Sequence, residues 1–277
     1  MRESQFPKLG SNDATADTRD AMHAYARVLG NCLKACRSKR KHWWHASLRP
    51  SLNGLTTGIV RAAADFEIEL DFRRAELRAR ASNDSGFDVG LSGQPASEIA
   101  ALVGDFMLTN DVGDFNEDIP VADWPNFSAS QSESMGKVLR SVATAMETFR
   151  AGIREETSPI QLWPHHFDLS MIWLPGDKIP GQDPADEEYS DKQMNFGFAF
   201  GDEGIPEPYF YVTAYPTPDA MPAMPLPAGS EWRTDGFNGA VLTYRSLLEA
   251  SDPNSYLQDF WIRLLAAGQQ HKLERNT

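Results

Sequence analysis

Residues 193–215 read QMNFGFAFGDEGIPEPYFYVTAY and hold two runs in which apolar residues alternate with polar or small ones. In the first run Met194, Phe196 and Phe198 occupy every second position, and residues 208–215 alternate in the same way. Successive side chains of a β-strand point to opposite faces of the sheet. Each run therefore predicts a strand with one apolar face and one polar face.

The same alternation recurs elsewhere along the chain, with Gly, Asn and Asp in the intervening turns. Further strands are predicted over HWWHASLRPSL (42–52), DFEIELDF (65–72), AELRARA (75–81), HHFDLSMIW (165–173) and GAVLTY (239–244). Strands that follow one another through turns favour antiparallel sheets.

Apolar residues spaced three and four apart predict about four helices between these strands. One spans Thr18–Arg37 and another covers residues 95–108. A third begins with a capping box formed by Ser130 and Glu133, and a closing helix starts at Asp252–Pro253. The fold class expected is α+β, with mainly antiparallel sheets packed against these helices.

The order of helix, strands and helix occurs twice, over residues 19–110 and 130–270. We interpret this as a duplication or as two similar layers. Residues 1–18 are expected to be a flexible tail, and residues 19–277 a single α+β domain. The sequence leaves the oligomeric state open.

The net charge of −13 excludes several classes of partner. A nucleic-acid-binding protein presents a basic face to the phosphates, and the only basic run, CRSKRKHWWH (36–45), is interpreted as the positive end of a helix. No apolar run approaches the roughly 20 residues that span a bilayer. The polar N-terminus lacks a signal sequence. We therefore expect a cytoplasmic protein without a membrane or nucleic-acid partner.

Candidate site residues lie on the polar faces of the predicted strands. Asp168, Asn195, Tyr211 and Thr213 fall on such faces, together with small residues that leave room. Tyr, Asn and Asp in this setting suit a recess for a small ligand. The alternative is a second packed layer whose tyrosine hydroxyls are satisfied by hydrogen bonds.

Two further residues are candidates from the first half of the chain. Arg49 and His45 share a strand face and could reach an anionic group of the ligand. We expect them to complete the recess if the two sheets adjoin.

Other polar patterns are interpreted as structural. Carboxylates alternate over residues 65–71, and Arg78 and Arg80 on the next strand predict a solvated, salt-bridged face. His165 and His166 point to opposite faces of a strand, so at most one of them can join a given metal site. No metal and no cofactor is expected. The two cysteines, Cys32 and Cys36, are interpreted as helix-face residues.

A set of short motifs is spread over roughly residues 20–265. Its residues are His42, Trp43, Trp44, Gly54, Leu55, Thr56, Thr57, Ser158, Pro159, Phe167, Asp168, Leu169, Tyr209, Tyr211, Tyr215 and Pro216. In these motifs the chain resembles a bacterial family of unknown function. Many members of that family carry small residues where His165 and His166 stand, which weakens any mechanism that requires either histidine. The resemblance implies no assigned activity.

Three classes of function stay open. The leading hypothesis is a protein that binds a small polar or aromatic metabolite in the recess. The second is a cofactor-independent hydrolase or isomerase in which Asp168 or His166 acts as general acid or base. The third is an assembly protein whose tyrosine face is an interface.

Overall fold

The structure of the chain, a computed structural model, has antiparallel sheets and α-helices, so the predicted α+β class is confirmed. Of the 277 residues it describes 6–10, 13–113, 119, 121–186, 188–218, 221, 224–235 and 237–274. The predicted flexible tail, residues 1–18, lies partly outside the described residues.

The chain forms two compact units. The N-terminal unit contains the described residues of Pro7–Ser141 together with Gln161–Phe167. The C-terminal unit contains Phe6, Val142–Ile160 and the described residues from Asp168 onward. Each unit is built from separate stretches of sequence, and the single domain expected over residues 19–277 stays a prediction.

The N-terminal unit holds an antiparallel sheet in which strands follow the order of the chain. Its strands are β1 (Arg49–Pro50), β2 (Gly54–Thr56), β3 (Phe66–Asp71), β4 (Glu76–Ala81) and β5 (Gly86–Gly90). Residues Phe66, Ile68 and Leu70 on β3 are buried, as their alternation predicts.

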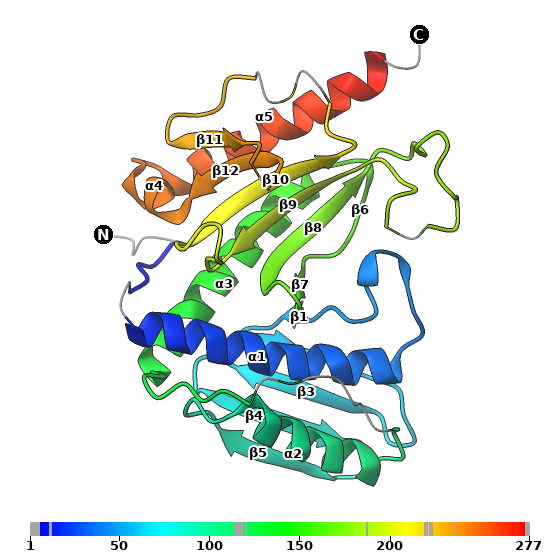
Figure 1. Ribbon diagram of the computed structural model, residues 1–277, viewed down its shortest axis with the longest axis vertical. Coiled ribbons are helices and arrows are strands. Elements are labelled where there is room, and N and C mark those ends of the chain that lie inside the picture. Colours follow the sequence, from blue (N-terminus) through cyan, green and yellow to red (C-terminus); the bar gives the residue numbers. More distant parts are fainter. Residues whose placement is uncertain are drawn as a thin grey trace. The chain divides into compact units, whose positions relative to one another are not determined.

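Helices α1 (Asp13–Cys36) and α2 (Ala96–Thr109) belong to the same unit, and Figure 1 shows them beside β3–β5. The ring of Phe106 on α2 contacts Phe66 at a centroid distance of 5.5 Å and Phe87 at 5.8 Å. The apolar faces of α2 and of the sheet thus form one core. Both cysteines of α1 are free thiols.

The strand predicted over residues 42–52 is largely wrong. Residues Lys41–Trp43 form a 3₁₀ turn, η1, and only β1 and an isolated bridge at Leu48 are extended in this stretch. His42 and Trp43 adopt left-handed conformations, with φ of 49° and 57°. Alternation of side chains cannot continue through such a turn, so the faces assigned to residues 42–49 are wrong as well.

The C-terminal unit contains an antiparallel sheet with the order β11-β12-β10-β9-β8-β6. Its strands are β6 (Glu156–Thr157), β8 (Asp168–Leu174), β9 (Gln193–Ala199), β10 (Tyr209–Tyr215), β11 (Ser230–Arg233) and β12 (Gly239–Thr243). The register Leu169↔Phe198↔Phe210 places these three side chains on one face. This confirms the predicted apolar face. The short strand β7 (Gln161–Trp163) belongs to the N-terminal unit.

Helices cover that apolar face. The second part of α3 (Ala129–Ala151) and α5 (Pro253–Glu274) lie along the sheet in Figure 1, and the short α4 (Tyr244–Glu249) follows β12. Phe149 of α3 contacts Phe196 at 5.0 Å and Trp261 of α5 at 5.3 Å between ring centroids. The aromatic residues of sheet and helices therefore form one buried layer.

The first residues of α5 and α3 show whether the two predicted helix-start motifs are present. Asp252 accepts a hydrogen bond from the Ser255 backbone N–H at 3.1 Å, and Pro253 is the first residue of α5, as predicted. The capping box is wrong, because α3 begins before Ser130 and Glu133 instead pairs with Lys137 at 2.9 Å. Among the described residues, no helix is long and apolar enough to cross a membrane.

The aromatic layer generates a prediction about stability. Phe198 is 1% exposed and contacts Phe210 and Tyr244 at centroid distances of 5.1 and 5.9 Å. Phe198→Ala should lower the free energy of unfolding by about 3–5 kcal/mol, because it leaves a cavity among these rings. Urea denaturation measures the loss. Phe237→Ala, at a partly buried ring of the same unit, is the control and should cost clearly less.

Candidate functional site

The polar face of the C-terminal sheet brings two of the predicted site residues into direct contact. Asp168 opens β8, and its Oδ2 accepts a hydrogen bond from the Tyr211 hydroxyl of β10. Asp168 is 7% exposed. Burial first, and then the charge of Asp168, raise the pKa of Tyr211 well above its ordinary value. Tyr211 therefore keeps its proton and donates to the carboxylate.

Gly197 makes room for this contact. It lies on β9 between Ser170 and Tyr211 in the register of the sheet, and a Cβ at this position would overlap the Tyr211 ring. The small residue that suggested a recess in the sequence thus accommodates an aromatic ring. This geometry favours the packed-layer alternative at Gly197.

Asn195 and Thr213 are cross-strand neighbours on the same face, and both are half-buried. Beyond them along the strands, the Tyr209 hydroxyl donates to Asp202 at 2.5 Å. The four predicted residues of this unit, Asp168, Asn195, Tyr211 and Thr213, therefore lie on one face of β8–β10. Their role as a ligand recess stays a prediction.

The histidine pair is arranged differently from the prediction. His165 and His166 lie in a turn before β8, and their ring centroids are 4.4 Å apart, so they do not point to opposite faces of a strand. The turn is closed by the Phe167 N–H, which donates to the Trp163 carbonyl at 2.8 Å, and Phe167 has a φ of 57°. His166 is exposed and belongs to the N-terminal unit, whereas Asp168 belongs to the C-terminal unit.

A third histidine supports this turn. The His23 ring on α1 stacks on Phe167 with centroids 5.2 Å apart. Burial, and next the charge of Arg27, lower the pKa of His23. His23 is therefore held in its neutral form.

The two predicted residues of the N-terminal unit lie beside a group of cations. We define Arg37, Arg40 and Arg49 as the arginine cluster. The buried His45 accepts a hydrogen bond at Nδ1 from the Arg40 backbone N–H, at 3.1 Å. Burial first, and then the charge of Arg49, lower the pKa of Arg37. The positive charges of the cluster are thus close enough to oppose one another.

The turn after β2 holds two of these arginines. The Arg37 side chain donates to the Thr57 carbonyl at 2.7 Å. Gly58 follows with a φ of 62°, and a Cβ there would lie 3.8–3.9 Å from the Arg49 side chain. Arg37 and Arg49 therefore converge on Thr57 and Gly58, although residues 37 and 49 come from different elements.

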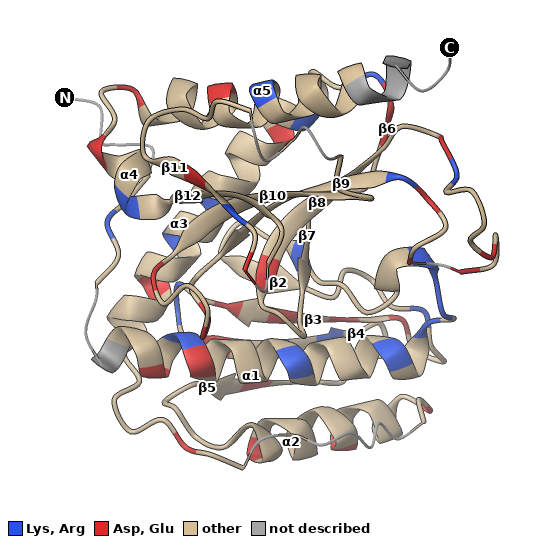
Figure 2. Ribbon diagram, turned by 45° about the horizontal axis from the view of Figure 1, so that its top comes forward, with Lys and Arg blue, Asp and Glu red and all other residues tan. Residues whose placement is uncertain are grey.

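An exposed aromatic ring completes this region. Trp43 is 42% exposed, and its ring stacks on His45 with centroids 5.6 Å apart. The Nζ atoms of Lys34 and Lys39 lie 6.0 and 5.8 Å from the Trp43 ring centroid. Lys and Arg are prominent on the segment that follows α1 in Figure 2. This surface can receive a negatively charged group next to a flat ring.

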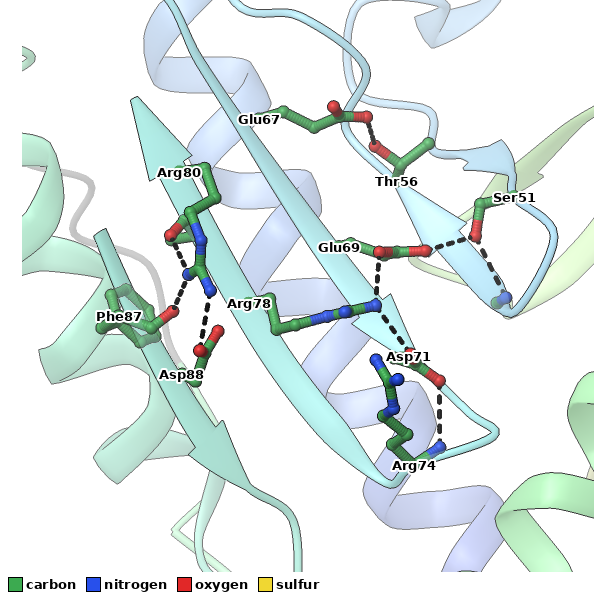
Figure 3. A network of polar contacts seen from close by, with 12 residues as sticks. Ser51, Thr56, Glu67, Glu69, Asp71, Arg74, Arg78, Arg80, Phe87 and Asp88 are labelled. Carbon is green, nitrogen blue, oxygen red and sulfur yellow. Dashed lines mark hydrogen bonds and ion pairs between the residues drawn. The ribbon is translucent and has the colours of Figure 1, made fainter. Parts of the chain in front are cut away.

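The carboxylates of β3 are salt-bridged in part, as predicted, but Asp71 is buried and not solvated. Figure 3 shows Arg78 of β4 between Glu69 and Asp71, with distances of 2.8 and 2.7 Å. Arg80 differs from the prediction, since it pairs with Asp88 of β5 at 2.7 Å. Among the described residues no three His, Cys, Asp or Glu side chains form a group that could hold a metal ion.

Sequence reasoning missed Arg37 and Arg40 as candidates. Their basic run was interpreted as a helix end, but α1 ends at Cys36, so both arginines follow the helix. The signal was present as a basic run ending in His-Trp-Trp-His within an acidic chain.

Comparison with known proteins yields one match. The model of a family of unknown function (DUF5996) matches residues 6–273. No curated protein matches the chain, and no solved structure does.

The contact between Asp168 and Tyr211 predicts the behaviour of a single variant. Asp168→Asn removes a charged acceptor and should lower the free energy of unfolding by about 1–3 kcal/mol. If these residues form a ligand recess, the variant should also lose affinity for a ligand found by screening. Melting temperature and affinity are measured on the same protein. Unchanged affinity in a destabilised variant would eliminate the recess.

His23 predicts a dependence of stability on pH. Because the folded state lowers the pKa of His23, the unfolded chain binds its proton more tightly. Stability contributed by neutral His23 should be complete above its ordinary pKa of 6.5 and decline as pH falls below it. Urea midpoints between pH 7.5 and 5 check this. His23→Gln should flatten the decline, and equal slopes in the parent protein and in this variant would contradict the prediction.

Proposed function

The chain belongs to the DUF5996 family, whose function is unknown, and we propose that it binds a small anionic metabolite through the arginine cluster. The negative group of the ligand lies against Arg37, Arg40 and Arg49. This proposal keeps the small-metabolite hypothesis, and it moves the primary contact to the N-terminal unit.

The observation that carries the proposal is the lack of counter-ions. Among the described residues, none of Arg37, Arg40 and Arg49 has a carboxylate within 4.0 Å, although the chain holds 39 Asp and Glu against 26 Lys and Arg. Other arginines do find acidic partners: Arg78, Arg80, Arg150, Arg233, Arg245 and Arg263. Holding three cations together without an anion is unfavourable, and a bound oxyanion would offset that repulsion.

The chemistry of arginine indicates the type of anion. A guanidinium presents donors in a planar fork that matches a carboxylate or a phosphate. Arg37 is half-buried and fixed on the Thr57 carbonyl, so it loses little freedom when it binds a ligand. Arg49 passes over Gly58, where the absence of a side chain keeps the neighbouring surface open.

Trp43 suggests that the ligand also carries a flat ring. A left-handed conformation costs a non-glycine residue roughly 1–2 kcal/mol, and Trp43 adopts it while leaving its ring partly exposed. Strain of this kind gathers at ligand sites, where surrounding contacts hold it in place. The His45 ring behind Trp43 and the bond from Arg40 to His45 connect the ring to the cluster.

Titration with simple anions tests the proposal. Phenyl phosphate and benzoate should quench Trp43 fluorescence and raise the melting temperature, and phenyl phosphate should bind more tightly than inorganic phosphate. Arg37→Gln should lower the affinity for phenyl phosphate about tenfold, because it removes one charged hydrogen bond to the ligand. Arg80→Gln, the same charge change in the same unit, should leave the affinity unchanged. Equal weakening by both variants, or no saturable binding to the parent, would refute an arginine site.

Acid/base catalysis by Asp168 is the second candidate. The observation in its favour is a buried carboxylate in contact with Tyr211 on a polar sheet face. Such a group can act as a general base, with the tyrosine orienting the substrate. Chromatographic assay of each ligand for conversion distinguishes the two candidates, because a binding protein returns its ligand unchanged.

A further inference from the structure

We propose a second oxyanion-binding site in the N-terminal unit, separate from the arginine cluster. It is a cavity of about 190 Å³ beside the first turns of α3, and its ligand is a phosphate-sized anion or a small dicarboxylate. The residues that line it are Asn53, Arg73, Glu133, Gly136, Lys137 and Arg140.

The walls of the cavity are fixed by the backbone. Gly136 allows α3 to lie close to the β1–β2 turn and to the β3–β4 turn. A Cβ at this position would lie 2.7 Å from Phe72 Cβ and 3.4 Å from the Asn53 carbonyl oxygen. The Phe72 N–H donates to that carbonyl at 3.0 Å, and Ser132 of α3 donates its hydroxyl to the Phe72 carbonyl at 2.8 Å. The β1–β2 turn, the β3–β4 turn and α3 are therefore joined around the cavity.

The carboxylate of Asp71, at the end of β3, does not neutralise the cavity. Asp71 is 0% exposed and is satisfied by Arg78 at 2.7 Å and by the Arg74 backbone N–H at 2.9 Å (Figure 3). Glu133 is paired with Lys137 at 2.9 Å. These two carboxylates already have cationic partners.

Basic side chains outnumber acidic ones in the lining of the cavity. Arg73 has no carboxylate within 4.0 Å among the described residues, and one hydrogen bond of Arg140 goes to the Leu52 carbonyl at 3.1 Å. The net charge of the lining is positive, with Arg73, Lys137 and Arg140 against Glu133. The half-buried Asn53 adds an amide that can donate a further hydrogen bond.

The size of the cavity limits the ligand. Sites for drug-sized molecules occupy about 300–1,000 Å³, and this one is smaller. Two guanidinium forks and an amide are the donor set that oxyanions accept. A free phosphate, a phosphate group at the end of a small molecule and a three-carbon dicarboxylate all meet these requirements.

Adjacent arginines provide a matched test. Arg73 lines the cavity, whereas Arg74 is exposed in the same turn and does not line it. All variants are made in an Arg37→Gln background, so that the arginine cluster and this cavity can fail separately. Isothermal titration with inorganic phosphate, and separately with malonate, is run at constant ionic strength.

The expected results differ in sign. Arg73→Gln should weaken binding by about tenfold, and Arg74→Gln by less than about twofold. Glu133→Gln should tighten binding, because it removes the one carboxylate of the lining and releases Lys137. If phosphate binds more tightly than malonate, the ligand carries a phosphate group. If malonate binds more tightly, the ligand is a carboxylate.

Three results would overturn the proposal. The first is an equal loss of anion affinity in Arg73→Gln and Arg74→Gln, which would mean that the anion is attracted only by diffuse charge. The second is weaker anion binding by Glu133→Gln. The third is the absence of saturable binding of either anion. Melting temperatures of all variants establish that each protein is folded during the titration.

Discussion

The buried carboxylate of Asp71 is the interaction on which the N-terminal unit depends most. It accepts hydrogen bonds from Arg78 at 2.7 Å and from the Arg74 backbone at 2.9 Å. A buried charge left without its partner costs about 3–5 kcal/mol, so this pair holds the end of β3 in one conformation. The next residue, Phe72, connects the same turn to Asn53 and to Ser132 of α3. Through these two neighbouring residues the end of β3 is connected to Arg78, to the β1–β2 turn and to α3.

Some charged side chains of this acidic chain have a partner of opposite charge or a hydrogen-bond donor, and others do not. Asp71 and Glu69 share Arg78, and Oδ2 of Asp168 accepts a hydrogen bond from the hydroxyl of Tyr211. The arginine cluster and Arg73 lack such a partner among the described residues. An acidic protein can hold local positive surfaces of this kind because carboxylates on other elements do not reach them. Both proposed sites follow from that uneven distribution.

The sequence predicted the sheets well and the turns poorly. Alternation placed Phe198 and Tyr211 on opposite faces of the C-terminal sheet, and both assignments agree with the register. The interpretation of residues 42–52 as a strand was wrong because His42 and Trp43 adopt left-handed conformations, which no periodic pattern reveals. Likewise the His165–His166 pair lies in a turn closed by a backbone hydrogen bond. Part of the candidate site was found in this way, and Arg37 and Arg40 were missed.

What the sequence determined by itself is therefore local. Residue periodicity sets which face of a strand or helix is apolar, and Asp252–Pro253 sets where α5 begins, since these depend on neighbours along the chain. Tertiary structure alone decided which charges are balanced. Arg80 pairs with Asp88 and not with Glu67, while Arg37 meets the Thr57 carbonyl from twenty residues away. Electrostatic partners are chosen by distance in space, and sequence spacing carries no record of that distance.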